Sequence, residues 1–159
     1  MVTIGVYEWD AGRFLAALER ADVRVLLDVR QRRGVRGPQY AWANSLRLQD
    51  ALAAARIAYE HRFELAPTTE LRHLQYAEDA REGVGKRNRV ALAPAYRDRY
   101  VREILDRVDL AAVLEGFPID GAGALLCVEA DPEACHRSLI AERMASDYGV
   151  EVSHLRPER

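Results

Sequence analysis

The densest group of reactive side chains in the sequence occupies four consecutive positions, Cys135, His136, Arg137 and Ser138. They supply a thiol, an imidazole, a guanidinium and a hydroxyl. Asp131 and Pro132 precede them and are typical of a helix start, because a carboxylate accepts hydrogen bonds from first-turn amides and proline fits the first helical position. We therefore expect a helix that begins just before Cys135. The free amides and the positive dipole end of such a helix attract anions.

Cys135 is the candidate nucleophile of this group. A thiol at a helix start, beside His136 and Arg137, ionises more readily than a free cysteine, and the thiolate is the nucleophilic form. The alternative is a small buried residue that packs the helix onto a sheet. At about 100° per residue, Cys135 falls roughly 145° from the centre of the apolar stripe of this helix, so the periodicity does not indicate a core position.

The three residues that follow Cys135 are candidate substrate-binding residues. His136 falls within about 45° of the apolar stripe, which favours a hydrogen-bonded histidine tucked against the sheet, able to orient a carboxylate at a strand end. Arg137 and Ser138 would clamp a phosphate or carboxylate together with the first-turn amides. The alternative is that Arg137 neutralises a buried acid, either Asp28 or Glu129.

Cys127 lies in an apolar strand and is expected in the core, with redox pairing to Cys135 as the alternative. A metal site would require Cys127, Cys135, His136 and a carboxylate to converge. No close Cys-x-x-Cys or His-x-x-x-His pair indicates one, so we predict neither a metal ion nor another cofactor.

Strand-like and helix-like segments alternate along the chain and must position these groups. The expected strands are residues 2–6, 23–30, 57–63, the segment around Cys127, and 150–155. The expected helices are residues 10–21, 44–56, 67–79, 94–108 and the helix at Cys135. This alternation predicts a single α/β domain over residues 1–159, a three-layer sandwich with a mainly parallel sheet of about five strands and helices on both faces.

Further candidate residues follow the ends of these strands, and ligands of an open parallel sheet bind at that carboxyl edge. Asp28 and Glu129 are candidates for proton transfer. Arg30 would complete the anion clamp, and Tyr7 would contact the substrate. The alternative for Asp28 and Arg30 is an internal salt bridge.

A loop over residues 30–38 holds the densest cluster of arginines, and Tyr40 and Trp42 follow it. Its candidate nucleic-acid-binding residues are Arg32, Arg33, Arg36 and Tyr40. Residues 83–89 form a second basic loop. Arginines with aromatic neighbours suit phosphate contacts and base stacking in nucleotides or single-stranded nucleic acids. The alternative is a solvated loop in an arginine-rich protein, in which Lys86 is the only lysine.

The composition argues against three classes of protein: a basic nucleic-acid-coating protein, a membrane protein and a disulfide-stabilised scaffold. A net charge of -2 argues against a globally basic nucleic-acid coat. The N-terminal segment has no basic region followed by an apolar one, and no apolar run could span a bilayer, so we expect a cytoplasmic protein without a membrane partner. Two cysteines are too few for a disulfide scaffold in 159 residues. The sequence makes no prediction of oligomeric state.

The motif around Cys127 and Cys135 closely resembles the family called domain of unknown function 488. The resemblance is carried by residues 125–129 and 131–140, and by residues 3–5, 26–30, 38–40 and 152–155 in the expected order. It implies a single α/β domain whose paired cysteines are functionally important, and it supplies no established reaction. Two loops depart from the family pattern, at residues 31–33 and 64–67, and we expect them to alter substrate choice.

Three functional hypotheses follow. The first is an enzyme that acts on a phosphate-bearing substrate, a nucleotide or nucleic acid, at the carboxyl edge of the sheet. The second is a noncatalytic nucleic-acid or nucleotide-binding module that uses the arginine loop. The third is a redox or metal-responsive regulator that uses Cys127 and Cys135.

Overall fold

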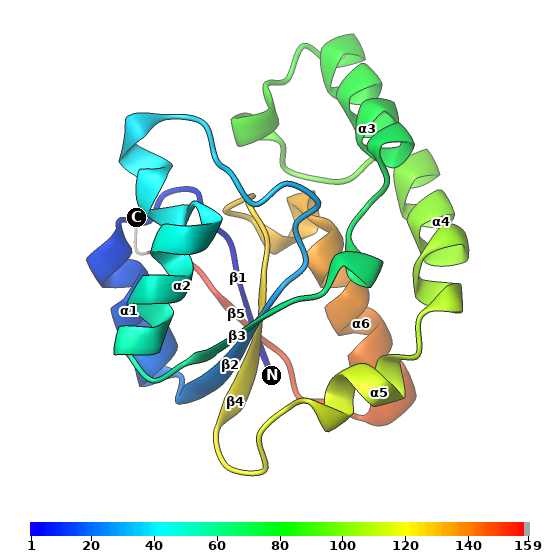
Figure 1. Cartoon of the computed structure of the whole chain (residues 1–159). Helices are drawn as coiled ribbons and strands as arrows, with labels where there is room; N and C mark the ends of the chain where they lie inside the picture. The colour runs from blue at the N-terminus through cyan, green and yellow to red at the C-terminus, as the bar shows by residue number, and fades with distance from the viewer. Residues whose placement is uncertain (158–159) are drawn as a thin grey trace.

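Five strands form one sheet with the order β3-β2-β4-β1-β5, and every neighbouring pair is parallel. The computed structural model describes residues 1–157 (Figure 1). The strands are β1 Val2–Ile4, β2 Val23–Asp28, β3 Ala58–His61, β4 Ala122–Leu126 and β5 Ser153–Leu155. The expected α/β class with a sheet of about five strands is confirmed, and the sheet is wholly rather than mainly parallel.

Six α-helices among the described residues cover the two faces of this sheet. They are α1 Ala11–Arg20, α2 Ser45–Ala54, α3 Thr69–Arg81, α4 Pro94–Glu103, α5 Leu110–Glu115 and α6 His136–Tyr148. Figure 1 shows α1 and α2 on one side of the sheet and the other four on the opposite side. The predicted three layers are confirmed.

Each face of the sheet has its own apolar core. Phe14 of α1 and Leu48 of α2 pack with Leu26 and Leu126 on one face. On the other face, Leu27 and Leu125 pack with Tyr100 of α4 and with Ile140 and Met144 of α6. Strands β2 and β4 are covered on both faces. Their sequences are therefore near-continuous aliphatic runs, which is typical of central parallel strands.

Local signals at helix starts are confirmed at two sites. The carboxylate of Asp10 accepts a hydrogen bond from the backbone N–H of Arg13 and caps α1. Thr68 caps α3 by accepting from the N–H of Leu71. The expected helix over 94–108 is shorter, because α4 ends at Glu103 and a separate 3-10 turn, Leu105–Arg107, follows.

The predicted helix start at Asp131 and Pro132 begins only a short 3-10 turn, and the α-helix starts later. A 3-10 turn, Pro132–Ala134, follows Asp131, whose side chain does not cap it and instead accepts from Arg156 at 2.8 Å. The α-helix begins at His136, and Cys135 is its N-cap residue with extended backbone angles, φ -139° and ψ 141°. The helical periodicity therefore does not apply to Cys135, which explains why this thiol is buried although it lies off the apolar stripe.

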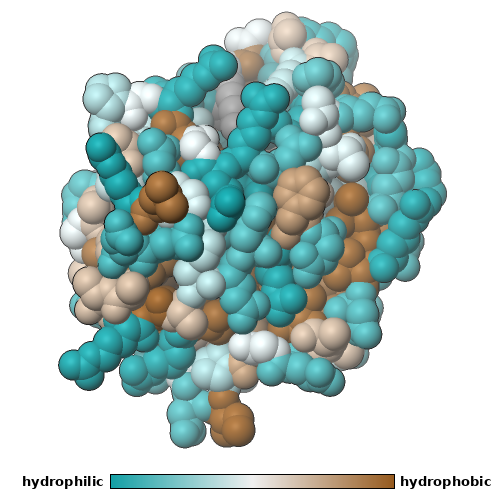
Figure 2. Space-filling model, in the orientation of Figure 1, coloured by the Kyte–Doolittle hydropathy of each residue, from teal (hydrophilic) through white to brown (hydrophobic). Residues whose placement is uncertain are grey.

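In the orientation of Figure 1, the surface is largely hydrophilic, and its apolar residues form separate patches (Figure 2). Across residues 1–157, none of the helices combines the length and the apolar character that a membrane crossing requires.

Candidate functional site

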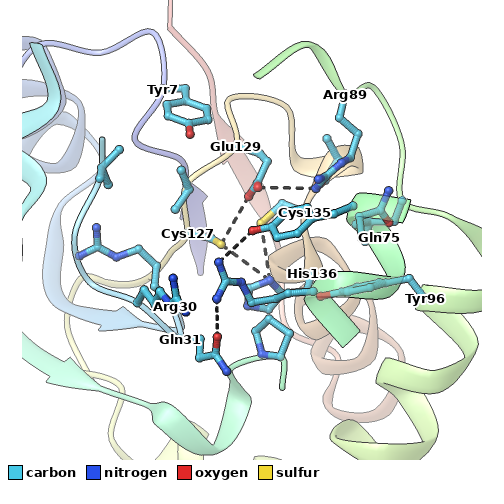
Figure 3. Close-up of a pocket in the computed structure, with 18 of the residues that line it drawn as sticks. Tyr7, Arg30, Gln31, Gln75, Arg89, Tyr96, Cys127, Glu129, Cys135 and His136 are labelled. Atoms are coloured by element: carbon cyan, nitrogen blue, oxygen red, sulfur yellow. Dashed lines mark hydrogen bonds and ion pairs between the residues drawn. The ribbon is translucent and has the colours of Figure 1, made fainter. Parts of the chain in front are cut away.

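A cavity of about 460 Å³ lies at the carboxyl edge of the sheet, where the segments after β1, β2 and β4 meet α3 and the start of α6 (Figure 3). Its buried lining includes Cys127, Glu129, Cys135 and His136, which we call the thiol–imidazole cluster. Further buried residues such as Arg30 and Arg89 also line it, together with exposed or half-buried side chains, among them Arg32, Arg36, Arg72 and Tyr76. A cavity of this size suits a small-molecule ligand.

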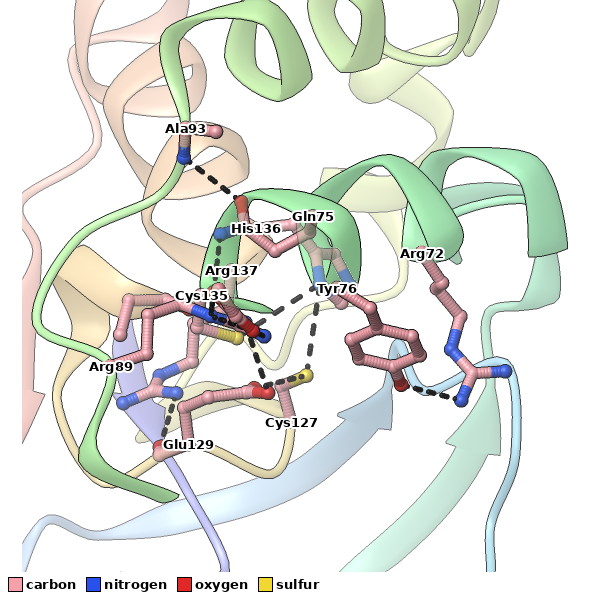
Figure 4. A network of polar contacts seen from close by, with 12 residues as sticks. Arg72, Gln75, Tyr76, Arg89, Ala93, Cys127, Glu129, Cys135, His136 and Arg137 are labelled. Atoms are coloured by element: carbon pink, nitrogen blue, oxygen red, sulfur yellow. Dashed lines mark hydrogen bonds and ion pairs between the residues drawn. The ribbon is translucent and has the colours of Figure 1, made fainter. Parts of the chain in front are cut away.

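The thiol–imidazole cluster joins residues from a strand end and a helix start. Cys127 directly follows β4, and its N–H donates to the carbonyl of Ile4 at 3.1 Å. The Nδ1 atom of His136 lies 3.7 Å from the Sγ of Cys127 and 3.9 Å from the Sγ of Cys135 (Figure 4). An Oε2 atom of Glu129 lies 3.6 Å from the Sγ of Cys127.

The imidazole of His136 is held in one orientation. Its Nε2 lies 3.0 Å from the carbonyl oxygen of Val29, and Tyr100 packs against its ring. A carbonyl only accepts hydrogen bonds, so Nε2 carries a proton, and in the neutral ring the Nδ1 lone pair faces the two sulfur atoms. The predicted hydrogen-bonded histidine tucked against the sheet is confirmed.

The electrostatics of the cluster differ between its two thiols. Burial alone would raise the pKa of Cys135, but a hydrogen bond from Cys127 and the positive charges of Arg137 and His136 bring that pKa well below its usual range. Burial and the neighbouring Cys135 raise the pKa of Cys127 well above its usual range. Burial lowers the pKa of His136, but the charge and hydrogen bond of Cys135, together with the charge of Glu129 and the Val29 carbonyl, outweigh burial and raise that pKa. These opposite shifts favour ionisation at Cys135 over ionisation at Cys127.

Arg89 connects the cluster to α3, and the basic-loop interpretation of this residue is wrong. Its side chain is buried, donates from Nε to Asp79 Oδ1 at 2.9 Å, and approaches Glu129 at 3.6 Å. Gln75 donates to the same Asp79 at 2.9 Å and accepts from the N–H of Ala93 at 2.9 Å (Figure 4). The one sequence signal for this network is the i,i+4 spacing of Gln75 and Asp79 on one face of α3.

The salt-bridge interpretation of Asp28 and Arg30 is confirmed. Arg30 Nη2 lies 2.7 Å from Asp28 Oδ2, and Arg30 Nη1 donates to the carbonyl of Ala43 at 2.9 Å. The hydroxyl of Tyr59 also donates to Asp28. Asp28 is fully buried and lies outside the cavity lining, which does not suit a general base for a substrate there. Arg30 contributes to the lining, and each of its three guanidinium nitrogens already donates a hydrogen bond to Asp28 or Ala43.

Arg137 and Ser138 point into the protein interior rather than into the cavity lining. Arg137 is fully buried and donates to the carbonyls of Glu129 at 2.6 Å and Ala130 at 2.9 Å. The Ser138 hydroxyl donates to the carbonyl of Cys135 at 2.9 Å. Both side chains therefore bond to nearby backbone carbonyls and do not form the expected anion clamp. Arg137 instead holds the turn that carries Glu129.

The predicted nucleic-acid-binding residues of the arginine loop do not all lie at the same place in the structure. Arg32 and Arg36 line the cavity, whereas Arg33 lies 3.4 Å from the hydroxyl of Tyr59. Tyr7 lines the cavity, and its ring lies 5.2 Å from that of Tyr40. Both rings lie under the guanidinium of one further arginine, Arg87, at 5.4 and 5.5 Å. The side chain of Lys86, in the second predicted basic loop, lies outside the described part of the structure.

Helix α3 contributes cavity residues that no sequence motif indicated. Arg72 donates to Gln31 at 2.6 Å and to the hydroxyl of Tyr76 at 2.8 Å, and all three line the cavity. Only the proximity of α3 to the carboxyl edge shows that these residues belong to the site.

Comparison with known proteins identifies the family of this chain but no reaction. A family model described as domain of unknown function DUF488 matches residues 10–144. No curated protein and no solved structure matches the chain.

Proposed function

Since this chain belongs to the DUF488 family, whose description names no reaction, we propose from the geometry of its cavity that it is an enzyme acting on a phosphate-bearing substrate such as a nucleotide. One observation carries the proposal: exposed and half-buried arginines and the thiol–imidazole cluster line the same cavity. A bound anion would therefore lie beside the reactive groups.

Three arginines would hold the anion at the mouth of the cavity. Arg32 and Arg36 come from the loop after β2, and Arg72 comes from α3. Guanidinium groups bind phosphate through paired N–H donors, which gives both attraction and orientation. Tyr7 and Tyr76, which line the same cavity, offer aromatic surfaces against which a base could stack.

The buried end of the cavity would supply the chemistry. The Cys135 thiolate would attack the phosphorus atom as the bond to the leaving oxygen breaks, and a water molecule that gives its proton to Glu129 would then cleave the S–P bond. Alternatively, the cluster would coordinate a metal ion that activates the substrate. In either case the substrate reaches the cluster from the arginine-lined mouth. Asp28, Arg137 and Ser138 support this site from the interior and do not contact the substrate in the proposed mechanism.

The test combines binding with protection of the thiols. Phosphate, mononucleotides and a short oligonucleotide are titrated into the reduced protein by calorimetry, and the rate of iodoacetamide alkylation is followed for both cysteines. We expect one nucleotide class to bind and to slow alkylation. The double variant Arg32→Ala/Arg36→Ala should weaken binding by at least about tenfold, since each charged hydrogen bond contributes roughly 1.5–3 kcal/mol.

Arg24→Ala serves as the matched control, because Arg24 pairs with Asp22 on the surface, away from the cavity. It should bind as the wild type does. Alkylation that no phosphate compound slows, with no heat of binding, would reject the proposed substrate class.

A noncatalytic nucleic-acid-binding module is the second candidate, favoured by the packing of Arg87 over Tyr7 and Tyr40. It predicts oligonucleotide binding that falls steeply with salt, because each phosphate contact releases a counterion. Such binding would survive Cys135→Ala and weaken in Arg87→Ala. Preference for mononucleotides over oligonucleotides would instead favour the enzyme.

A further inference from the structure

The thiol–imidazole cluster has the donor set of a transition-metal site. The Sγ atoms of Cys127 and Cys135 and the Nδ1 of His136 all lie within 4.8 Å of one another, and all three residues are buried. The geometry points to a mononuclear metal centre for a soft divalent ion such as Zn²⁺, with Cys127, Cys135 and His136 as its three protein ligands. Two thiolates and one imidazole suit zinc, and a hard ion such as Mg²⁺ would prefer oxygen ligands.

The nitrogen–sulfur distances are near those of a tetrahedral site, and the two sulfur atoms lie no more than 4.8 Å apart. With Zn–S bonds of about 2.3 Å and Zn–N bonds of about 2.0–2.1 Å, neighbouring ligand atoms of a tetrahedron lie roughly 3.5–3.8 Å apart. His136 Nδ1 lies 3.7 Å from one sulfur and 3.9 Å from the other. Metal binding would therefore draw the three ligand atoms closer together, the two sulfur atoms by no more than about 1 Å.

The surroundings orient the ligands before any metal ion arrives. The carbonyl of Val29 fixes Nε2 of His136 as a donor and leaves Nδ1 directed at the sulfurs, which is the usual outer-shell arrangement for a metal-bound histidine. Cys127 is held at the end of β4 and Cys135 at the N-cap of α6, so neither ligand lies on a free loop. Two thiolates would balance the charge of a divalent ion in this buried position.

The fourth position of the metal faces the cavity, because all three ligands contribute to its lining. A site with three protein ligands and one open position is typical of catalytic rather than structural zinc. Glu129, with its Oε2 3.6 Å from Cys127 Sγ, is placed to accept a proton from a water molecule at the open position. Metal binding stands independently, whereas the approach of an anionic substrate to the metal rests on the proposed function.

The experiment is a titration of the reduced, metal-free full chain with Co²⁺ and Zn²⁺. Co²⁺ reports thiolate ligation by charge-transfer absorption and reports tetrahedral geometry by intense visible bands. We expect one equivalent to bind with both signatures, and one equivalent of Zn²⁺ to displace it. Cys127→Ser, Cys135→Ser and His136→Ala should each weaken affinity more than about 100-fold, since outer-shell losses alone cost roughly 10- to 100-fold.

His73→Ala is the matched control, because His73 is exposed on α3 and should leave Co²⁺ binding unchanged. Circular dichroism identifies any variant that fails to fold. If a variant does not fold, X-ray absorption of the wild-type Zn²⁺ complex tests the ligand set instead, and we expect it to show two sulfur ligands. Co²⁺ spectra without charge transfer, or affinity that the three substitutions leave unchanged, would overturn the metal centre. Rapid formation of a Cys127–Cys135 disulfide without metal uptake would overturn it in favour of a redox role.

Addition of nucleotide or inorganic phosphate to the Co²⁺ protein separates the two proposals. A shifted visible spectrum would support both the open position and the anionic substrate. An unchanged spectrum with the metal still bound would leave the metal centre standing and reject substrate binding at it. If calorimetry shows nucleotide binding but the protein takes up no metal, the metal centre is rejected and the substrate class stands. The Cys135 thiolate would then be the reactive group.

Discussion

At the scale of single residues, the buried arginines of this protein act within the protein and not on a ligand. Arg30 and Arg137 have almost no exposed surface, and their donors go to Asp28 and to backbone carbonyls. A buried guanidinium without such partners would be costly, because desolvation of the charge must be offset by hydrogen bonds. The arginines that line the cavity with exposed or half-buried side chains are Arg32, Arg36 and Arg72.

Arg30→Met should lower the free energy of unfolding by about 3–5 kcal/mol, because it leaves the Asp28 carboxylate buried without its charged partner. The double variant Asp28→Leu/Arg30→Met should recover much of this loss, since the unpaired charge is gone. Urea denaturation measures both. Arg24→Ala removes an exposed pair and should cost at most about 1 kcal/mol. A loss in Arg30→Met as small as that of the control would contradict the prediction.

At the scale of elements, the close approach of two strand ends builds the carboxyl edge. The N–H groups of Val6 and Tyr7 both donate to the carbonyl of Val128, at 3.0 and 2.9 Å, so the segments after β1 and β4 stay paired beyond the strands. Gly5 permits this approach, because a Cβ there would lie 1.9 Å from the carbonyl oxygen of Glu129. The position of Glu129 at the cluster therefore depends on a glycine in a different element.

Gly5→Ala should destabilise the protein by at least about 1–3 kcal/mol, because the added methyl group forces the two backbone segments apart. Gly12→Ala is the matched control: its Cβ would meet only an ordinary contact at 3.5 Å, and α1 gains up to about 1 kcal/mol of helix propensity. Thermal and urea unfolding compare the two variants. Equal stability of Gly5→Ala and wild type would show that the segments are not constrained as described.

At the scale of the whole molecule, the C-terminal strand joins the fold to its beginning. Strand β5 pairs with β1, and Nδ1 of His154 lies 2.8 Å from the hydroxyl of Thr3. Partial burial lowers the pKa of His154, and the positive charge of Arg137 lowers it further. The other charged groups that act on this ring are Glu133, Arg156 and Glu142.

This lowered pKa makes global stability depend on pH. The unfolded chain, with a histidine pKa of about 6.5, binds the proton more readily than the folded protein, so stability present at neutral pH is lost as the pH falls through that value. The unfolding free energy of wild type minus that of His154→Gln should therefore decrease between about pH 7.5 and pH 5. The exposed His73→Gln serves as control and should show no such trend. A difference that grows towards acid pH would refute the assignment.

Much of the fold follows from local pattern. The aliphatic runs of β2 and β4, the caps at Asp10 and Thr68, and the alternation of strands and helices depend on neighbours in the chain, so periodicity and capping chemistry are enough to predict them. The burial of His136 follows from the same periodicity. The buried state of Cys135 does not, because an extended N-cap residue lies outside the helical repeat.

The sequence by itself determined the α/β class, the parallel sheet, the gathering of polar residues at the carboxyl edge and the resemblance to one family. Only the tertiary structure decided which of those residues share a cavity. Cys127, Cys135 and His136 meet because β4 is central in the sheet and α6 begins at its carboxyl end. Arg89 bonds to Asp79, and Arg137 bonds to the carbonyls of Glu129 and Ala130, partners that the turns of the fold bring against them. Which partner a polar side chain bonds to cannot be predicted from the spacing of residues along the chain, because it depends on the order of the strands in the sheet.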